Sequence, residues 1–246
     1  MDSEKLSPVE HAALNVIITG ASKGIGKAIA DKFAAQGYNL VLCSKNETRL
    51  LQAVEDIRQK NKDCKILFYP ANLRNKDQTK AFGKWILDQK ITIDILVNNA
   101  GDFTPGNIYD EEEGLLENMI EVNLYSAYHL TRDLLPEMMK QKKGHIFNIC
   151  SIASLQAYPN GGSYSISKFA LMGFSKNLRE EMKPHNIKVT AVYPGAVYTS
   201  SWASSGIEQD RIMETKDIAE IIYSASQLSP QACVEDIVVR PQLGDL

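Results

Sequence analysis

The sequence has no excess of positive charge, no cysteine motif and no long apolar run. Its 27 Lys and Arg residues against 30 Asp and Glu residues give a net charge of −3. Nothing in this balance favours binding to nucleic acid or to an anionic membrane. The four cysteines, at positions 43, 64, 150 and 233, form neither a CxxC pair nor a zinc-ligand pattern. We therefore expect buried free thiols in a reducing compartment, and no metal site.

Targeting signals, repeats and linkers are also missing. The N-terminal sequence MDSEKLSPVEH is polar and acidic, without the basic and apolar regions of a signal peptide. No apolar run approaches the roughly 18 residues that span a bilayer. No fixed repeat and no Pro/Gly/Ser-rich linker divides the chain. These absences predict a cytoplasmic protein with a single domain over residues 1–246, in which residues 1–12 form a flexible N-terminal segment.

Short runs rich in Val, Ile and Phe alternate with amphipathic stretches. The runs cover residues 14–19, 39–43, 65–69, 93–97, 145–149, 188–192 and 235–239. Such runs suit strands buried on both faces of a parallel sheet, and the stretches between them have helical spacing. The alternation predicts an α/β fold of the doubly wound Rossmann type, a seven-stranded parallel sheet with about six helices on both faces. Two irregular stretches, 101–114 and 198–214, follow predicted strands and should lie at the ligand-binding edge of the sheet.

A glycine-rich loop, Thr19 to Gly26, joins the first predicted strand to a helix. Its three glycines allow a tight turn and close approach of the backbone to a pyrophosphate, and the N–H groups at a helix start attract phosphate. The spacing GxxxGxG differs from the usual GxGxxG, and no GK[ST] follows as in a Walker loop. The position between a strand and a helix favours dinucleotide binding over a purely structural turn.

The residues after the second predicted strand favour NADP(H). Sheets that bind NAD usually place an acid there for the ribose 2′-hydroxyl, whereas this chain has Ser44 and Lys45. Lys23 and Lys45 can both reach a 2′-phosphate, and Ser44 can hydrogen-bond it. The alternative is that both lysines are solvated surface charges.

Tyr164 and Lys168 lie four residues apart in a stretch of helical periodicity, so they share one helix face. The pKa of tyrosine is normally near about 10, and a nearby ammonium group lowers it. The pair is therefore a candidate acid–base centre. Ser151 lies 13 residues before Tyr164, just after a predicted strand and at the same sheet edge as the glycine loop.

Together, these motifs resemble the short-chain dehydrogenase/reductase family over residues 14 to 240, and within it members of the 3-oxoacyl carrier-protein reductase and sepiapterin reductase types. The segment TGASKGIG (19–26) is similar to the family's cofactor loop, and NNAG (98–101) to its sheet-stabilising motif. Ser151 and the pair Tyr164 and Lys168 match the catalytic serine and YxxxK motif. Asn123 matches the fourth catalytic residue, and Pro194-Gly195 the turn over the nicotinamide.

The resemblance implies reduction of a carbonyl by NADPH. Tyr164 would donate the proton, Ser151 would hold the carbonyl oxygen, and Lys168 would lower the pKa of Tyr164 and bind the nicotinamide ribose. Asn123 would hold a water through a local helix distortion. The implied cofactor-binding residues are Gly20, Ser22, Lys23, Gly24, Ile25, Ser44, Lys45, Asn72, Leu73, Asn99, Ala100, Gly101, Tyr164, Lys168, Pro194, Gly195, Val197 and Thr199. The substrate-binding residues are Ser151, Ser154, Tyr164 and Trp202.

One position departs from the family pattern. Asn72 stands where the family usually has an Asp that accepts a hydrogen bond from the adenine amino group. The amide oxygen of Asn72 can still accept this bond, but as a neutral partner.

Several functional alternatives fit these motifs. Besides an NADPH-dependent carbonyl reductase, the chain fits an NAD-dependent alcohol dehydrogenase or a non-catalytic NADP-sensing protein. The candidate substrates are a 3-oxoacyl thioester, a pterin side-chain ketone, a small β-hydroxy acid and a xenobiotic carbonyl compound. Family members commonly form dimers or tetramers through the two long helices before and after the Ser151 strand, so the resemblance implies a homodimer or homotetramer. The stretch 115–139 is rich in Leu, Met and Tyr, and these side chains can face the sheet, a partner subunit, or both.

Overall fold

A seven-stranded parallel sheet forms the centre of the molecule. The computed structural model describes residues 13–199 and 206–245, so the predicted flexible segment 1–12 and Trp202 lie outside the described residues. The strands are β1 (Asn15–Thr19), β2 (Asn39–Ser44), β3 (Ile66–Pro70), β4 (Ile95–Asn98), β5 (Gly144–Ile149), β6 (Ile187–Pro194) and β7 (Asp236–Val239). All are parallel, in the order β3-β2-β1-β4-β5-β6-β7. This confirms the fold class predicted from the sequence.

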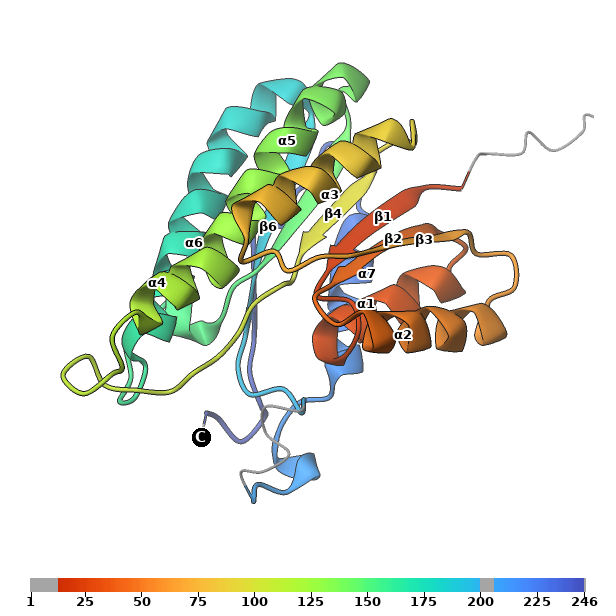
Figure 1. The fold of residues 1–246 in the computed structure, drawn as a ribbon. Coiled ribbons are helices and arrows are strands. Elements are labelled where there is room, and N and C mark those ends of the chain that lie inside the picture. Colours follow the sequence, from red (N-terminus) through yellow and green to blue (C-terminus); the bar gives the residue numbers. More distant parts are fainter. Residues whose placement is uncertain (1–12, 200–205, 246) are drawn as a thin grey trace, which may run out of the picture.

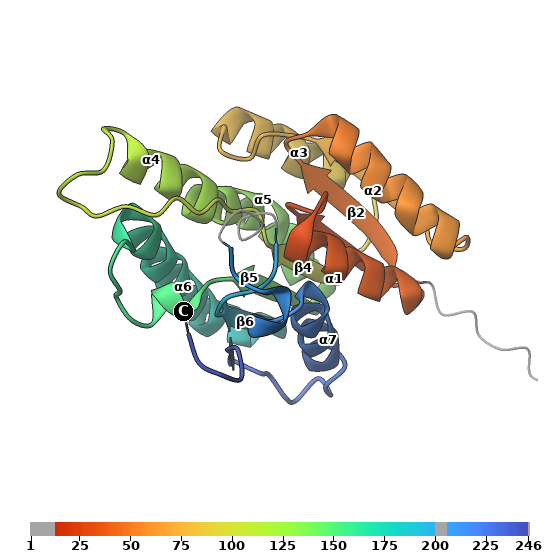
Figure 2. The same ribbon diagram turned by 90° about the horizontal axis from the view of Figure 1, so that it is seen from below.

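Helices cover both faces of the sheet (Figures 1 and 2). Their bounds are α1 (Gly24–Ala35), α2 (Glu47–Lys60), α3 (Lys76–Asp88), α4 (Leu115–Ile120), α5 (Ser126–Gln141), α6 (Gly162–Met182) and α7 (Thr215–Ser226). Helices α1, α2 and α7 pack on one face, and α3, α5 and α6 on the other. In the described residues α4 and α5 count as two helices because a π-helical turn, Glu121–Tyr125, interrupts one continuous stretch.

Each face of the sheet has its own hydrophobic core. Phe33 and Ile57 belong to the cluster between the sheet and α1, α2 and α7. Phe82, Leu134 and Met138 belong to the cluster between the sheet and α3 and α5. Strands buried on both sides in this way carry apolar side chains at consecutive positions, which is why β1 reads NVIIT with every residue buried. A rigid sheet of this kind fixes the loops at its carboxyl edge.

The strand order reverses at the centre of the sheet. The chain proceeds from β1 outward to β2 and β3, then returns to place β4 on the other side of β1. Loops that follow β1 and β4 therefore diverge and leave a crevice at the carboxyl edge, the usual ligand-binding place in open α/β sheets. Within the described ranges, no helix combines the length and apolarity needed to cross a bilayer.

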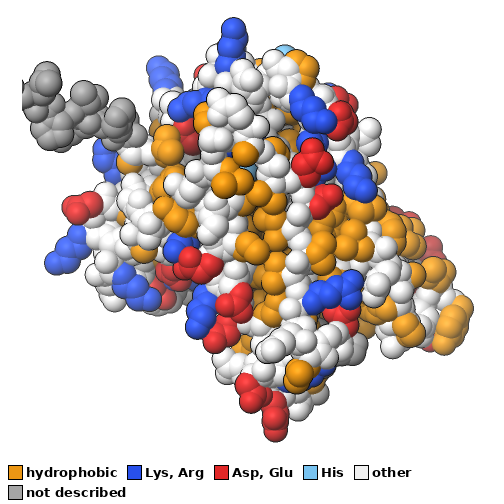
Figure 3. Space-filling view, turned by 180° about the vertical axis from the view of Figure 1, so that it is seen from behind, with side chains coloured by type: hydrophobic (Ala, Val, Ile, Leu, Met, Phe, Trp, Pro, Cys, Tyr) orange, Lys and Arg blue, Asp and Glu red, His pale blue; other side chains and the backbone are white. Residues whose placement is uncertain are grey.

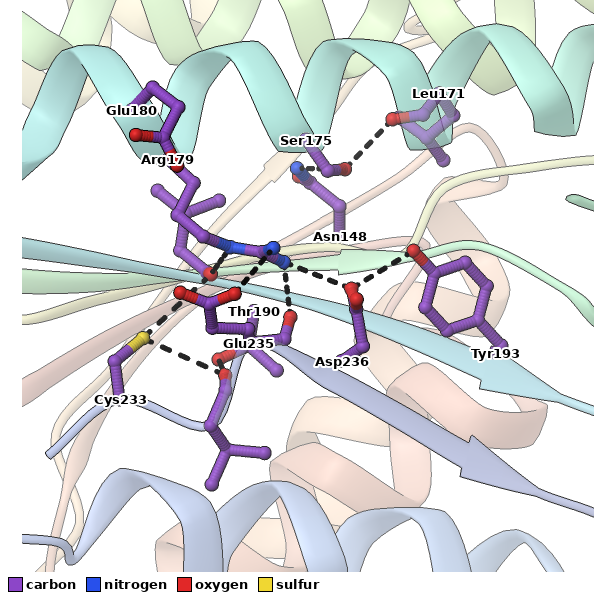
Figure 4. Close-up of polar contacts among 12 residues, drawn as sticks. Asn148, Leu171, Ser175, Arg179, Glu180, Thr190, Tyr193, Cys233, Glu235 and Asp236 are labelled. Carbon is purple, nitrogen blue, oxygen red and sulfur yellow. Dashed lines mark hydrogen bonds and ion pairs between the residues drawn. The ribbon is translucent and has the colours of Figure 1, made fainter. Parts of the chain in front are cut away.

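A buried arginine ties α6 to the last two strands (Figure 4). The Arg179 side chain is only 7% exposed. Its Nε donates to the Val189 carbonyl oxygen at 3.0 Å, and its Nη2 donates to the Glu235 carbonyl oxygen and to Asp236 Oδ1, the latter at 3.0 Å. The Tyr193 hydroxyl donates to the same Asp236 oxygen at 3.1 Å. This network holds β7, the edge strand, in place.

We predict that Arg179→Met lowers the free energy of unfolding by about 2–3 kcal/mol. Breaking a fully buried ion pair costs roughly 3–5 kcal/mol, and the Glu235 and Asp236 side chains are 55% and 42% exposed, which reduces this cost. Urea unfolding measures the change. The matched control is Lys140→Met, which removes a helix-surface pair with Glu137 (side chains 73% and 39% exposed) and is expected to cost less than about 0.5 kcal/mol. Equal unfolding midpoints for the two variants would contradict the role given to Arg179.

Candidate active site

A cavity of about 760 Å³ lies at the carboxyl edge of the sheet. All the cofactor-binding residues expected from the sequence line it, together with Ser151. Its wall also includes residues that the sequence did not single out as ligand-binding: Ala71, Asp102, Val122, Ile149, Cys150, Ile152, Tyr158, Pro159, Ala196 and Asp245. The motifs that are far apart in the chain therefore meet in one place.

The glycine loop wraps closely around the end of β1. Gly20 and Gly24 have φ values of +65° and +57°, a backbone region that favours glycine. A Cβ on Gly26 would lie 2.4 Å from the Gly20 carbonyl oxygen, so no larger residue fits there. Helix α1 follows without an acidic residue in its first turn or a side-chain cap at its N-terminus. Its first N–H groups can therefore bind an anion.

The NNAG segment braces the glycine loop from β4. The Thr19 hydroxyl accepts hydrogen bonds from the backbone N–H groups of Asn99 and Ala100, at 3.0 Å and 2.9 Å. The Asn99 amide donates back to the carbonyl oxygens of Thr19 and Gly20, at 2.9 Å and 3.2 Å. Asn98 donates instead to Asn148 at 2.8 Å, which links β4 to β5. These contacts join both sides of the crevice.

Polar residues gather at the far end of the cavity, beyond β2 and β3. The Ser22 and Ser44 hydroxyls lie 2.7 Å apart and connect the glycine loop to the end of β2. Lys45 Nζ lies 3.2 Å from Asp102 Oδ2. Asn72 lines the cavity, and its amide oxygen accepts from the Arg74 backbone N–H at 3.3 Å. This end holds the residues that the sequence associated with the adenosine half of a cofactor.

Ser151, Tyr164 and Lys168 meet at the other end of the cavity. Ser151 follows β5, and its backbone is fixed by a short turn in which its hydroxyl accepts from the Ala153 N–H at 3.2 Å. Tyr164 and Lys168 lie one turn apart on α6, with Lys168 Nζ 5.8 Å from the centre of the Tyr164 ring. Lys168 Nζ donates to the Ile149 carbonyl oxygen at 2.9 Å. The ring of Phe103 contacts Tyr164 edge-on, with ring centres 4.8 Å apart.

Burial is the largest influence on the pKa values of Tyr164 and Lys168. It raises the pKa of Tyr164 to about 12, against the lowering effect of a hydrogen bond with Ser151. Burial also lowers the pKa of Lys168 to about 8. The pKa of Tyr164 is therefore raised, not lowered as its pairing with Lys168 led us to expect, because desolvation is the largest cause. At neutral pH Tyr164 is a phenol that can donate a proton.

Asn123 lies in the π-helical turn between α4 and α5, which is the helix distortion that the family resemblance implied. It is 1% exposed and does not line the cavity. Its amide oxygen accepts from the Asp102 N–H at 3.0 Å, and its amide nitrogen donates to the Asp102 carbonyl at 3.1 Å and to Ser167 at 2.9 Å. Asn123 therefore acts as a positioning residue for the loop after β4.

Ser154 and Trp202, two of the predicted substrate-binding residues, are not among the described residues of the cavity lining. Ser154 is fully buried and outside the cavity lining, because its hydroxyl accepts from the Ser151 N–H at 3.3 Å and closes the turn after β5. Ser154 therefore does not contact substrate as predicted, and instead it supports the backbone of Ser151. Trp202 lies outside the described residues.

Among the cavity residues that the sequence did not single out, Asp102, Tyr158 and Asp245 have oxygen-bearing side chains. Asp102 directly follows the NNAG motif, and this adjacency is the only clue to it. Tyr158 and Asp245 reach the cavity through a loop and the C-terminal segment, whose paths depend on tertiary packing. The Arg211 guanidinium holds that segment by donating to the carbonyl oxygens of Gly244 and Asp245, at 3.1 Å and 3.2 Å.

Comparison with known proteins agrees with this arrangement. The sequence profile described as short chain dehydrogenase matches residues 14–210. The chain belongs to the short-chain dehydrogenase family. An uncharacterised oxidoreductase of Staphylococcus epidermidis is 31% identical over 226 residues, which cover 92% of this chain and 96% of that protein.

Solved structures of the short-chain dehydrogenase family have the same fold. The alcohol dehydrogenase of the archaeon Thermococcus sibiricus, complexed with 5-hydroxy-NADP, superposes with a TM-score of 0.86 at 25% identity, covering 94% of this chain and 97% of that one. A metagenomic short-chain oxidoreductase in complex with NADP gives 0.80 at 30% identity, covering 93% and 97%. The chain is thus an oxidoreductase of this family.

The cavity residues fit the nicotinamide dinucleotide that short-chain dehydrogenases use. A Cβ at position 26 would clash with the Gly20 carbonyl oxygen and the Asn99 amide, so Gly26 lets α1 begin close against the glycine loop. Gly20, Ser22 and Gly24 of this loop line the cavity at the N-terminus of α1. Around Val197, the Tyr198 N–H donates to the Met213 carbonyl and the Met213 N–H donates to the Ala196 carbonyl, at 2.8 Å and 3.1 Å. This pairing directs the N–H and C=O of Val197 away from Met213. Val197 can therefore offer both groups to a carboxamide.

We predict that burial of the Lys168 ammonium destabilises the fold. Its pKa falls from 10.5 to about 8 on folding, so the unfolded chain binds more protons between these pH values and wild-type stability rises with pH there. One pKa unit corresponds to about 1.4 kcal/mol, which makes the cost about 3 kcal/mol at neutral pH. The stability of wild type relative to Lys168→Met should therefore improve by about that amount as the pH rises from about 7 towards about 10.5.

Urea unfolding of both proteins across this pH range measures the effect. Lys176→Met is the matched control, since Lys176 is exposed on the same helix. Its stability difference from wild type should not change with pH. A pH-independent difference for Lys168→Met would contradict the burial of a charged ammonium group.

Proposed function

We propose that the protein reduces a carbonyl compound to an alcohol with NADPH. The observation that carries this proposal is the meeting of Ser151, Tyr164 and Lys168 in the same cavity as the glycine loop. When bound, the cofactor supplies the hydride. The residues of this chain then have to hold the carbonyl oxygen and give it a proton.

Tyr164 is the proposed general acid. Its raised pKa, about 12, keeps the phenol protonated at neutral pH, so the proton is available when a carbonyl oxygen gains electron density. The Ser151 hydroxyl beside it donates a second hydrogen bond to that oxygen. Lys168, at the base of the cavity next to Gly101, supplies a positive charge that stabilises negative charge developing on the oxygen. Asn123 keeps the neighbouring loop in place.

The proposed preference for NADP(H) rests on the residues at the far end of the cavity. Ser44 ends β2 where an NAD-binding sheet usually carries an acid, and Lys45 follows it. Lys23 stands at the start of α1 and lines the cavity too. Both solved structures described above contain NADP or a derivative of it, which supports the same preference. Asn72 would accept from the adenine amino group.

The substrate is proposed to be a small or medium carbonyl compound. Among the described residues of the lining, the cations are Lys23, Lys45 and Lys168, all of which are assigned to the cofactor. Phe103 and Tyr158 line the cavity near Tyr164, and no cation of the described lining is left for an acidic partner, so a neutral carbonyl fits better than an acidic carrier protein. A 3-oxoacyl thioester, a pterin side-chain ketone and a xenobiotic carbonyl compound are the candidates for reduction, and a small β-hydroxy acid is the candidate for the reverse reaction.

We predict that the purified protein binds NADPH at least tenfold more tightly than NADH and reduces members of a carbonyl panel. Tyr164→Phe should lower kcat by about 10²–10⁴-fold, because it removes the general acid, while the dissociation constant for NADPH stays within about twofold. Fluorescence titration measures the dissociation constants for NADPH and NADH. The loss of NADPH absorbance during the reaction measures kcat.

Tyr158→Phe is the matched control, because it removes another phenol from the same cavity. It should lower kcat by less than about tenfold. Equal or tighter binding of NADH would instead favour an NAD-dependent alcohol dehydrogenase. Full activity of Tyr164→Phe would contradict the acid role, and NADPH binding without any turnover would favour a cofactor-sensing protein.

We also propose a cytoplasmic homodimer or homotetramer. Leu134 and Met138 are buried against the sheet, whereas Leu116 and Tyr125 are 40% and 47% exposed. Figure 3 shows hydrophobic side chains gathered in a continuous band on the face opposite to that of Figure 1. Strand β7 is also an edge strand, and an exposed edge can pair with another chain. Light scattering at micromolar concentration should give two or four times 27.4 kDa, and a monomer would contradict this.

A further inference from the structure

One carboxylate holds two cations at the adenosine end of the cavity. Asp102 Oδ2 lies 3.2 Å from Lys45 Nζ and 3.3 Å from Arg74 Nη2. Arg74 is held in place by a further hydrogen bond, from its Nη1 to Asn118 Oδ1 at 3.1 Å. Lys45 and Asp102 both line the cavity. The Asp102 carboxylate is thus already paired with two of the cations at this end, Lys45 and Arg74.

These contacts cross the crevice. Asp102 follows β4, whereas Lys45 and Arg74 follow β2 and β3, and β1 lies between β2 and β4 in the sheet. Neighbouring strands are about 4.8 Å apart, so the side chains span roughly 10 Å or more of the carboxyl edge. The span passes the end of β1, where the glycine loop begins. The ion pairs therefore lie where a dinucleotide has to be accommodated.

Asp102 has a fixed backbone in this cluster. The backbone N–H and C=O of Asp102 are both hydrogen-bonded to the buried amide of Asn123, at 3.0 Å and 3.1 Å. Lys45 is 62% exposed on a long flexible side chain. When an anionic ligand draws Lys45 away, Asp102 stays in place.

A phosphate group competes well for these cations. Exposed ion pairs such as those of Asp102 are weak, whereas a phosphate carries more charge and offers an arginine two oxygens in matching geometry. Ser22 and Ser44, linked at 2.7 Å, supply hydroxyl groups at the same end of the cavity. A ligand without this phosphate carries no group that competes with the Asp102 carboxylate for Lys45 and Arg74.

We propose that Asp102 is a cofactor-specificity residue: its carboxylate competes with the 2′-phosphate of NADPH for Lys45 and Arg74, and Arg74 is a second cation for that phosphate. The inference rests on the NADP(H) preference proposed above. Asp102 therefore weakens the binding of 2′-phosphorylated ligands and leaves ligands without that phosphate unaffected.

Binding of cofactor fragments tests this without any turnover. Calorimetry with 2′,5′-ADP and with 5′-AMP isolates the contribution of the 2′-phosphate. Asp102→Asn should tighten binding of 2′,5′-ADP by about fivefold and change binding of 5′-AMP by less than about twofold. Arg74→Met should weaken binding of 2′,5′-ADP by about fivefold, again with 5′-AMP nearly unchanged.

Asp110→Asn is the matched control, because Asp110 is exposed in the same loop and the substitution changes the net charge by the same amount. It should change binding of either fragment by less than about twofold. Asp102→Glu, which keeps the charge, should bind as wild type does. Circular dichroism confirms that each variant is folded.

The possible results separate this proposal from the proposed function. If wild type prefers 2′,5′-ADP, and Asp102→Asn matches Asp110→Asn or binds it more weakly, the competition is refuted and the NADP(H) preference stands. If wild type gains nothing from the 2′-phosphate, the NADP(H) preference is refuted. In that case a preference that emerges in Asp102→Asn supports competition, and its absence refutes that proposal as well.

Discussion

The hydrogen bonds between Thr19 and the backbone of Asn99 and Ala100 determine how the rest of the site is assembled. One hydroxyl at the end of β1 accepts from two consecutive N–H groups after β4, so the two strands on either side of the crevice have a fixed relative position. The Asn99 amide returns two bonds to the same turn. A glycine loop has little intrinsic rigidity, because glycine is conformationally permissive. Its shape here comes from the neighbouring strand.

Contacts with a neighbouring element also fix the polar residues further along the cavity. Asn123 holds the backbone of Asp102 by two hydrogen bonds and packs so closely on Gly101 that a Cβ there would lie 2.7 Å from its amide oxygen. Lys168 Nζ is in turn 3.5 Å from that position. The loop after β4 therefore links the proposed chemical centre to the ion pairs of Asp102. This arrangement lowers the free energy of unfolding at Lys168, because its ammonium group is buried with a carbonyl oxygen as its hydrogen-bond acceptor.

The fold could be predicted from the sequence because periodicity and burial carry the same information. Strands covered on both faces read as continuous apolar runs, and each predicted run lies within two residues of an observed strand. The glycine loop and Ser151 were found because they follow predicted strands, and the Tyr164–Lys168 pair because its spacing puts both residues on one helix face. Ser154 was misplaced because sequence adjacency to Ser151 does not say which way a side chain points. Tyr158 and Asp245 reach the cavity only through tertiary packing, which periodicity cannot report, and the position of Asp102 directly after the NNAG motif was the only clue to it.

Transfer of deuterium from the cofactor to a carbonyl carbon is the most direct test of the proposed reaction. The protein would be incubated with a carbonyl panel and NADPH carrying deuterium at C4 of the nicotinamide, in separate samples for each face of the ring. Because Tyr164 and Ser151 lie in the same cavity as the glycine loop, we predict that the alcohol carries one deuterium on its carbinol carbon. This label should appear with only one of the two deuterated forms of NADPH. Bound NADPH with no labelled alcohol from any member of the panel, or alcohol formed without label from either face, would contradict hydride transfer in this cavity.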